Sequence, residues 1–125
     1  MNYVWVALGG ALGSVLRYMV VNFSGRTFLT DFPVGTLLVN VIGCFVIACI
    51  GALGADKLDF NHQLRLFLFT GILGGFTTFS AFGYETFFLL RTSHYTLAFA
   101  NVCANVVLGL GAAIFGYVCG RQWPG

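Results

Sequence analysis

A stretch rich in glycine and hydroxyl side chains lies in the middle of a long apolar run, and its residue types could bind an ion. It reads Gly71-Ile-Leu-Gly-Gly-Phe-Thr-Thr-Phe-Ser-Ala-Phe-Gly83, inside a run from about Leu64 to Leu90. Glycine costs about 1 kcal/mol against alanine in a helix interior, and irregular backbone at membrane depth persists only where protein buries it or a wet cavity adjoins it. Because broken membrane helices present free carbonyls and amides as ion ligands, the stretch indicates an ion-binding break. The alternative is a glycine packing notch followed by hydroxyls bonded to their own helix.

Neutral hydrogen-bond donors also lie in the other apolar runs. Asn40 is in the second run, Thr78 and Ser80 are in the third, and Asn101 and Asn105 share one face of the fourth at i, i+4 spacing. Polar residues inside a membrane span are costly and therefore functional by default, although a lone asparagine can simply join helices, at about 0.6–2 kcal/mol each. Carboxylates, which a proton-coupled exporter or a cation channel needs at depth, are nearly absent from the spans. The donor set therefore favours a small anion.

Two phenylalanines and two charged residues flank the same region. Phe79 and Phe82 are three residues apart and so project from one helical face. The edge of a phenyl ring carries positive potential, so two rings presented edge-on could contact an anion; packing in a core is the commoner use of such a pair. Arg17, near the end of the first run, can extend its guanidinium to the interface. Glu85 lies past the break, where it could face an aqueous vestibule.

The composition decides what kind of scaffold positions these groups. The 125 residues are 58% hydrophobic and only 8% charged, which is typical of a membrane protein. The loops are too short for a soluble domain, a nucleotide site or an enzyme active site, and no basic tail suggests nucleic-acid binding. We therefore predict an all-α polytopic membrane protein with a single domain over residues 1–125 and four spans: Tyr3–Phe23, Val34–Gly54, Leu64–Leu90 and Leu97–Gly120.

The first span and the cysteines have plain structural interpretations. The first apolar run lacks a basic n-region, and Arg17 stands where a cleavage site of small residues would be needed, so we predict a retained span. All the cysteines fall inside spans without a CxxC pair, which indicates small apolar packing rather than a metal or redox site. They are Cys44, Cys49, Cys103 and Cys119.

Charge distribution gives an unusual prediction about orientation. Lys57, Arg65 and Arg121 lie on the side of the N-terminus, whereas Arg26 and Arg91 lie on the other side, with Arg17 close to it. Orientation follows the excess of Lys and Arg in short loops, and here the excess is nearly nil. Unless the N-terminal side is simply cytoplasmic, the chain can insert both ways and form an antiparallel homodimer. Small residues spaced for close helix approach also favour association; the pairs are Gly9 with Gly13, Gly71 with Gly75, and Gly116 with Gly120.

Three stretches of the sequence match one known family. They are Gly9-Gly-Ala-Leu-Gly-Ser-Val-Leu-Arg-Tyr18, Pro33-Val-Gly-Thr-Leu-Leu-Val-Asn-Val-Ile-Gly43 and Gly71-Ile-Leu-Gly-Gly-Phe-Thr-Thr-Phe-Ser-Ala-Phe82. With these stretches, and over its whole length, the sequence resembles the Fluc (CrcB) fluoride channel family. The resemblance implies a dual-topology antiparallel homodimer in a bacterial inner membrane, with two fluoride pores and a structural Na⁺ at the dimer centre. It implies passive export of cytoplasmic fluoride, which relieves fluoride toxicity.

The resemblance also implies roles for individual residues. The break would bind Na⁺ through the backbone carbonyls of Gly74 and Thr77. Phe79 and Phe82 would be the family's phenylalanine box, and Asn40 its pore asparagine. The family's polar track on the fourth span usually mixes tyrosine, serine and similar donors, and this sequence departs from that pattern with Asn101, Asn105 and Gly109. The further predicted site residues are Thr78, Ser80, Asn101 and Asn105 in the pore, and Arg17 and Glu85 in the vestibule.

Two other functions compete with this prediction. A small four-span multidrug exporter would have a similar length, but it would need a glutamate embedded in the first span, and that span holds no acid. A non-transporting assembly subunit would have the same composition.

Fluoride is small and tightly hydrated, so a narrow, uncharged, donor-lined pore would suit it better than it would suit a larger halide.

Overall fold

The computed structural model describes residues 1–56 and 58–124, so Lys57 and its place in the charge count lie outside the described residues. The described part is all-helical, and it contains four helical segments that are long and apolar enough to cross a membrane. These segments are Asn2–Thr27, Val34–Gly54, His62–Arg91 and Tyr95–Gln122. Each contains the corresponding predicted span, and all but the second extend past it by a few residues at both ends.

Three of the segments are single helices, and one is composite. The single helices are α1 (Asn2–Thr27), α2 (Val34–Asp56) and α6 (Tyr95–Gln122). The third segment is divided into α3 (His62–Arg65), the π-helix η1 (Leu66–Leu73), α4 (Gly74–Phe76) and α5 (Phe79–Arg91). The predicted break therefore exists, and it lies at residues 77 and 78 between α4 and α5. The π-helix was not predicted; such segments are rare and frequently occur near functional sites.

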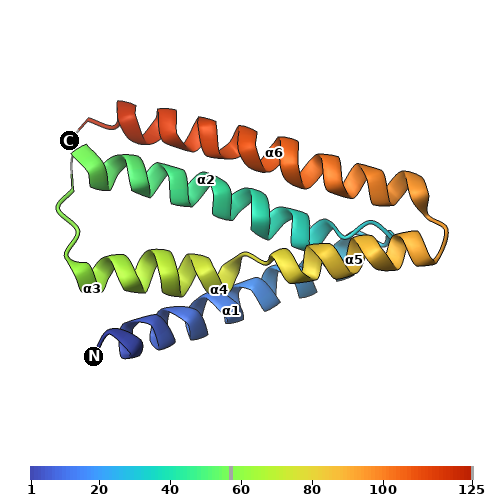
Figure 1. Ribbon diagram of the computed structural model, residues 1–125, viewed down its shortest axis with the longest axis horizontal. Coiled ribbons are helices and arrows are strands. Elements are labelled where there is room, and N and C mark those ends of the chain that lie inside the picture. Colours follow the sequence, from blue (N-terminus) through green and yellow to red (C-terminus); the bar gives the residue numbers. More distant parts are fainter. Residues whose placement is uncertain (57, 125) are drawn as a thin grey trace.

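The helices pair in two layers. Figure 1 shows α6 lying along α2, while α1 crosses the third segment at the level of η1 and α4. The N-terminus, the start of α3 and the end of α6 lie at one end of the bundle. Arg65 and Arg121 are therefore at that end, and Arg26 and Arg91, in the last turns of α1 and α5, are at the other.

Close contacts between helix backbones hold both pairs together. A Cβ on Gly13 would overlap the carbonyl of Ile72 in η1, and one on Gly116 would overlap the carbonyl of Phe45 in α2. The same holds for the other members of the three glycine pairs, each of which faces a helix of its own chain. Contacts within the protomer therefore account for these glycine pairs, and the predicted subunit association needs other support.

Little apolar surface is buried inside one chain. Val39 is fully buried, but most large apolar side chains of α1 and α6 point outward, as expected where lipid or another subunit covers them. Among the described residues, the largest fully buried side chains are Val39 and the polar Asn101. A buried amide in so thin a core requires hydrogen-bond partners, and these lead to the site.

Candidate ion site at the helix break

The break is held open by one asparagine side chain from α2. Thr77 and Thr78 are both extended, with φ and ψ of −86° and 159° and of −152° and 120°. The Asn40 side chain bonds both sides of the Thr78 backbone: its Nδ2 donates to the Thr78 carbonyl at 3.1 Å, and its Oδ1 accepts from the Thr78 amide at 2.9 Å. Asn40 therefore supplies the partner that the Thr78 N–H would have had in a continuous helix, and it also bonds the Thr78 carbonyl.

The same hydrogen bonds remove the usual donors from two carbonyls. In a continuous α-helix the Thr78 N–H would bond the Gly74 carbonyl and the Ala81 N–H would bond the Thr77 carbonyl. Here the Thr78 N–H bonds Asn40, and the Ala81 N–H bonds the Thr78 hydroxyl at 3.1 Å, which caps α5. The carbonyls of Gly74 and Thr77 are thus deprived of their i+4 donors, and Gly74 is exposed.

The hydroxyls near the break mostly serve the backbone. The Thr77 hydroxyl donates to the Leu73 carbonyl at 3.0 Å, and the Thr78 hydroxyl lies 3.3 Å from the Ser80 hydroxyl. Gly75 packs against the α1 backbone. The back-bonded hydroxyls and the glycine notch of the alternative interpretation therefore occur together with the break.

Three asparagines and a threonine form a continuous row of hydrogen bonds between α2, α6 and α5. Asn40 Nδ2 donates to Asn105 Oδ1 at 3.0 Å, and Asn105 Nδ2 donates to Asn101 Oδ1 at 3.0 Å. Asn101 Nδ2 donates to the Thr86 hydroxyl at 2.9 Å, which in turn donates to the Phe82 carbonyl at 2.8 Å. We refer to Asn40, Asn105, Asn101 and Thr86 as the amide row. The sequence indicated the asparagines but not Thr86, whose only signal was its position one turn after Phe82.

A groove of about 410 Å³ runs along the break. Asn40, Asn105, Thr78 and Phe79 line it, together with the released Gly74. The groove therefore brings together most of the donors that the sequence singled out. Ser80 is exposed, and Asn101 lies behind the groove, fully buried.

The two phenylalanines form one aromatic pair, of which Phe79 lines this groove and Phe82 does not. Their ring centroids are 5.5 Å apart and their planes are inclined by 56°. Phe79 is 82% exposed, whereas Phe82 is half-buried. An aromatic side chain left so open in the protomer is available to a partner subunit or to an ion.

Arg17 and Glu85 line a smaller cavity, of about 260 Å³, together with Thr36 and Thr78. The Thr36 hydroxyl donates to Glu85 Oε1 at 2.7 Å, and Glu85 Oε2 has no partner within the described part of the chain. Glu85 also borders a cavity of about 730 Å³ that reaches the loop between α1 and α2. Sequence reasoning missed Thr36, although it lies inside the Pro33–Gly43 stretch.

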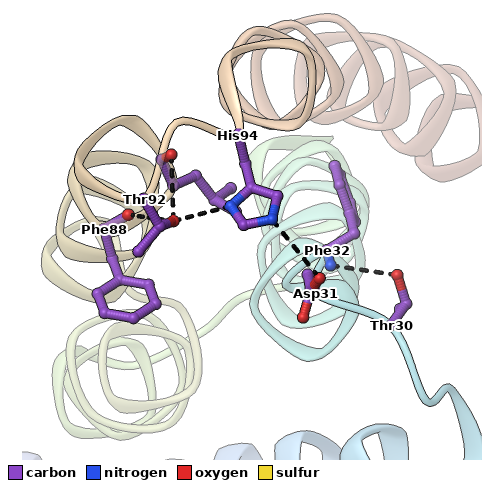
Figure 2. A network of polar contacts seen from close by, with 7 residues as sticks. Thr30, Asp31, Phe32, Phe88, Thr92 and His94 are labelled. Atoms are coloured by element: carbon purple, nitrogen blue, oxygen red, sulfur yellow. Dashed lines mark hydrogen bonds and ion pairs between the residues drawn. The ribbon is translucent and has the colours of Figure 1, made fainter.

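Two loops meet beside the larger of these cavities, which Asp31 lines. His94 Nε2 lies 3.8 Å from Asp31 Oδ2, and His94 Nδ1 lies 2.8 Å from the Thr92 hydroxyl (Figure 2). Thr92 also donates to the Phe88 carbonyl at 2.9 Å. Both members of the His94–Asp31 pair are exposed, so its contribution to stability is small.

Long apolar helices, a broken segment with released carbonyls and a groove of uncharged donors define a multi-pass membrane protein of the channel or transporter class. Comparison with known proteins makes the assignment more specific. The family described as CrcB-like protein, Camphor Resistance (CrcB), matches residues 4–117. The chain therefore belongs to the CrcB-like family.

Relatives named "Fluoride-specific ion channel FluC" are similar along almost the whole chain. The protein from Helicobacter acinonychis (strain Sheeba) is 45% identical over 123 residues, which cover 97% of this chain and 96% of that protein. The one from Parabacteroides distasonis is 46% identical over 115 residues, covering 92% and 89%. The one from Helicobacter pylori (strain G27) is 44% identical over 129 residues, covering 100% and 98%. These relatives give no support to the multidrug-exporter alternative.

Proposed function

We propose that this protein is a passive, fluoride-selective channel that exports cytoplasmic fluoride. The observation that carries the proposal is the groove at the helix break, where neutral N–H and O–H donors and the Phe79 ring meet. The chain's similarity to proteins named as fluoride-specific channels adds the identity of the anion. The first predicted span, now α1, holds no acidic residue that could couple transport to protons.

The groove suits a small anion for a physical reason. Fluoride must exchange its hydration shell for closely placed donors, and uncharged donors bind it without trapping it, as conduction requires. Both hydrogens of Asn40 Nδ2 are engaged, with the Thr78 carbonyl and with Asn105. An anion at Asn40 would therefore take an N–H in exchange for one of these bonds. The edge of the exposed Phe79 ring would offer positive potential beside it.

The proposal includes an antiparallel homodimer with dual topology. Arg65 and Arg121 at one end are balanced by Arg26 and Arg91 at the other, so the described loops carry no strong orientation signal. The groove is open on one side in a single protomer, and Phe79 projects from it. A second subunit would close the groove into a pore.

The family resemblance implies a structural Na⁺, and the donor set at the break fits one. Unwound backbone carbonyls are the ligands that membrane proteins use for Na⁺. The carbonyls of Gly74 and Thr77 have lost their helical donors to Asn40 and to the Thr78 hydroxyl. A two-fold axis beside the break would double these ligands. Bound there, Na⁺ would join the subunits and add fixed positive potential near the groove. Similarity to proteins from Helicobacter and Parabacteroides supports a bacterial inner membrane as the location.

Fluoride efflux from sealed proteoliposomes tests the proposal. Vesicles loaded with potassium fluoride and reconstituted with the protein should release fluoride when a potassium ionophore is added, as read by a fluoride electrode. Vesicles loaded with chloride and read by a chloride electrode should not empty. Absence of fluoride efflux from vesicles that contain folded protein would exclude the channel function, and efflux that requires a proton gradient would exclude the passive mechanism.

A further inference from the structure

Each end of the amide row is bonded to the backbone of α5 or its cap, which suggests that the row holds α5 in place. The row starts at the Thr78 N–H, which bonds Asn40, and passes through Asn105 and Asn101 to Thr86. It ends at the Phe82 carbonyl. Thr78 caps α5 and Phe82 lies one turn further along it. Both ends of the row therefore fix the turn that carries the two phenylalanines.

Donation runs in one direction along the row. Each asparagine accepts a hydrogen bond at Oδ1 and donates one from Nδ2 to the next member of the row. The Thr86 hydroxyl donates the last hydrogen bond, to the Phe82 carbonyl. The Thr86 hydroxyl has only one proton. That proton is used in the hydrogen bond to the Phe82 carbonyl. The Thr86 oxygen also accepts a hydrogen bond from Asn101 Nδ2, and this second bond fixes the direction in which the hydroxyl points.

The last two members of the row, Asn101 and Thr86, do not reach the groove. Asn40 and Asn105 line it, whereas Asn101 and Thr86 do not. Asn101 has no exposed surface even in the isolated protomer, so an anion in the groove cannot contact it. Its amide instead bonds Thr86 and Asn105.

A hydroxyl bonded to the carbonyl four residues earlier bends a membrane helix locally. Thr86 makes this bond to Phe82, the half-buried member of the aromatic pair. We propose that Asn101 is a positioning residue, which sets the Phe82 ring through the Thr86 hydroxyl without itself touching the anion. This inference rests on the proposed channel function, and it removes Asn101 from the predicted pore lining.

A double-mutant cycle on fluoride efflux separates positioning from direct contact. A misplaced contact of about 1 Å at a functional site can reduce a rate by up to about 100-fold, so Asn101→Leu and Thr86→Val should each reduce efflux by about 10- to 100-fold. If Asn101 acts through Thr86, the double variant should be no slower than the slower single variant. If the efflux of the double variant instead falls by the product of the two single losses, Asn101 acts independently of Thr86 and the proposal is overturned. Normal efflux in Thr86→Val would also overturn it.

Two further variants control for effects on folding. Thr86→Ser keeps the hydroxyl and should conduct like the wild type. Thr92→Val removes an equivalent hydroxyl, which bonds the Phe88 carbonyl at 2.9 Å outside the row, and should also conduct normally. Thr86→Val changes the side-chain volume little, so it tests the row even where Asn101→Leu does not fold. Loss of efflux in Thr92→Val equal to that in Thr86→Val would refute a specific role for the row.

A spectroscopic measurement tests the same inference without transport. 4-Fluorophenylalanine placed at position 82 gives one ¹⁹F signal, whose chemical shift reports the surroundings of the ring. Asn101→Leu and Thr86→Val should shift or broaden this signal, whereas Thr92→Val should leave it unchanged. An unchanged signal in both row variants would overturn the positioning role even if the channel function is confirmed. If wild-type vesicles do not release fluoride, the channel proposal fails while this measurement still tests the row.

Discussion

Replacing Phe79 by isoleucine separates an ion contact from simple packing. Isoleucine is comparably apolar but has no ring edge, so it removes only the feature that an anion would recognise. Phe79 is 82% exposed in the protomer, and its main partner within the chain is the Phe82 ring at 5.5 Å. The substitution should therefore destabilise the protomer by about the value of one aromatic pair, 0.5–1.5 kcal/mol. A loss that small leaves most of the protein folded.

The expected effect on transport is much larger than the effect on stability. If the ring edge contacts fluoride, Phe79→Ile should give a stable, purifiable protein whose efflux falls by at least tenfold, since about 1.4 kcal/mol of lost anion stabilisation already gives that factor. Phe79→Met should be intermediate, because a polarizable thioether can adapt to the site. Size-exclusion chromatography and thermal unfolding would establish that each variant is folded, and the proteoliposome assay would give the rate.

Phe115 provides a matched control. It is 62% exposed, its ring lies 5.7 Å from that of Phe45, and neither of these two residues lines the groove. Phe115→Ile should lose a similar pair energy and conduct normally. Wild-type efflux in folded Phe79→Ile would refute the ring-edge mechanism at this position, and equal losses in both variants would assign the effect to general destabilisation.

Three other predictions follow from the break and the topology. Gly75→Leu should abolish efflux, because even a Cβ at this position would lie 2.7 Å from a carbonyl oxygen of α1. Thr77→Ser should conduct, since it keeps both the backbone and the hydroxyl. Normal efflux in Gly75→Leu would contradict the role of the break. Exhaustive exchange of Na⁺ for a bulky organic cation should weaken efflux or dimer stability, as measured by thermal unfolding, and indifference to the cation would count against the carbonyl site. Single cysteines at the exposed loop positions Leu29 and Asp59, in a background without the native cysteines, should each label from both sides of the membrane; labelling of each site from one side only, in all molecules, would exclude dual topology.

The apolar runs predicted the helical segments well because lipid imposes a simple rule on length and polarity. The four helical segments contain the predicted spans, and the break falls where two glycines precede two threonines. The π-helix at Leu66–Leu73 could not be predicted in this way. Its hydropathy is that of any apolar helix, and its hydrogen-bond pattern depends on how η1 packs against α1.

The site was predictable in its residue types but not in its connections. Three of the neutral donors that the sequence singled out, Asn40, Asn105 and Thr78, line one groove at the break. The sequence could not show that Asn40 would clamp the Thr78 backbone, because that bond joins residues 38 positions apart and depends on the packing of α2. For the same reason the sequence did not single out Thr86, which bonds Asn101 fifteen positions away.

Asn40 links the two ions of the proposed channel. Its Oδ1 accepts from the Thr78 N–H and thereby diverts the donor that the Gly74 carbonyl would otherwise receive. Its Nδ2 donates to Asn105, and both asparagines line the groove in which an anion would bind. The Gly74 carbonyl that would bind Na⁺ and the amide that would bind fluoride therefore both depend on the Asn40 side chain and on the bonds it makes at the break. A charged residue at this position would attract the anion but would also hold it, whereas the neutral amide orders the backbone, frees a carbonyl for a fixed cation, and leaves the anion free to move.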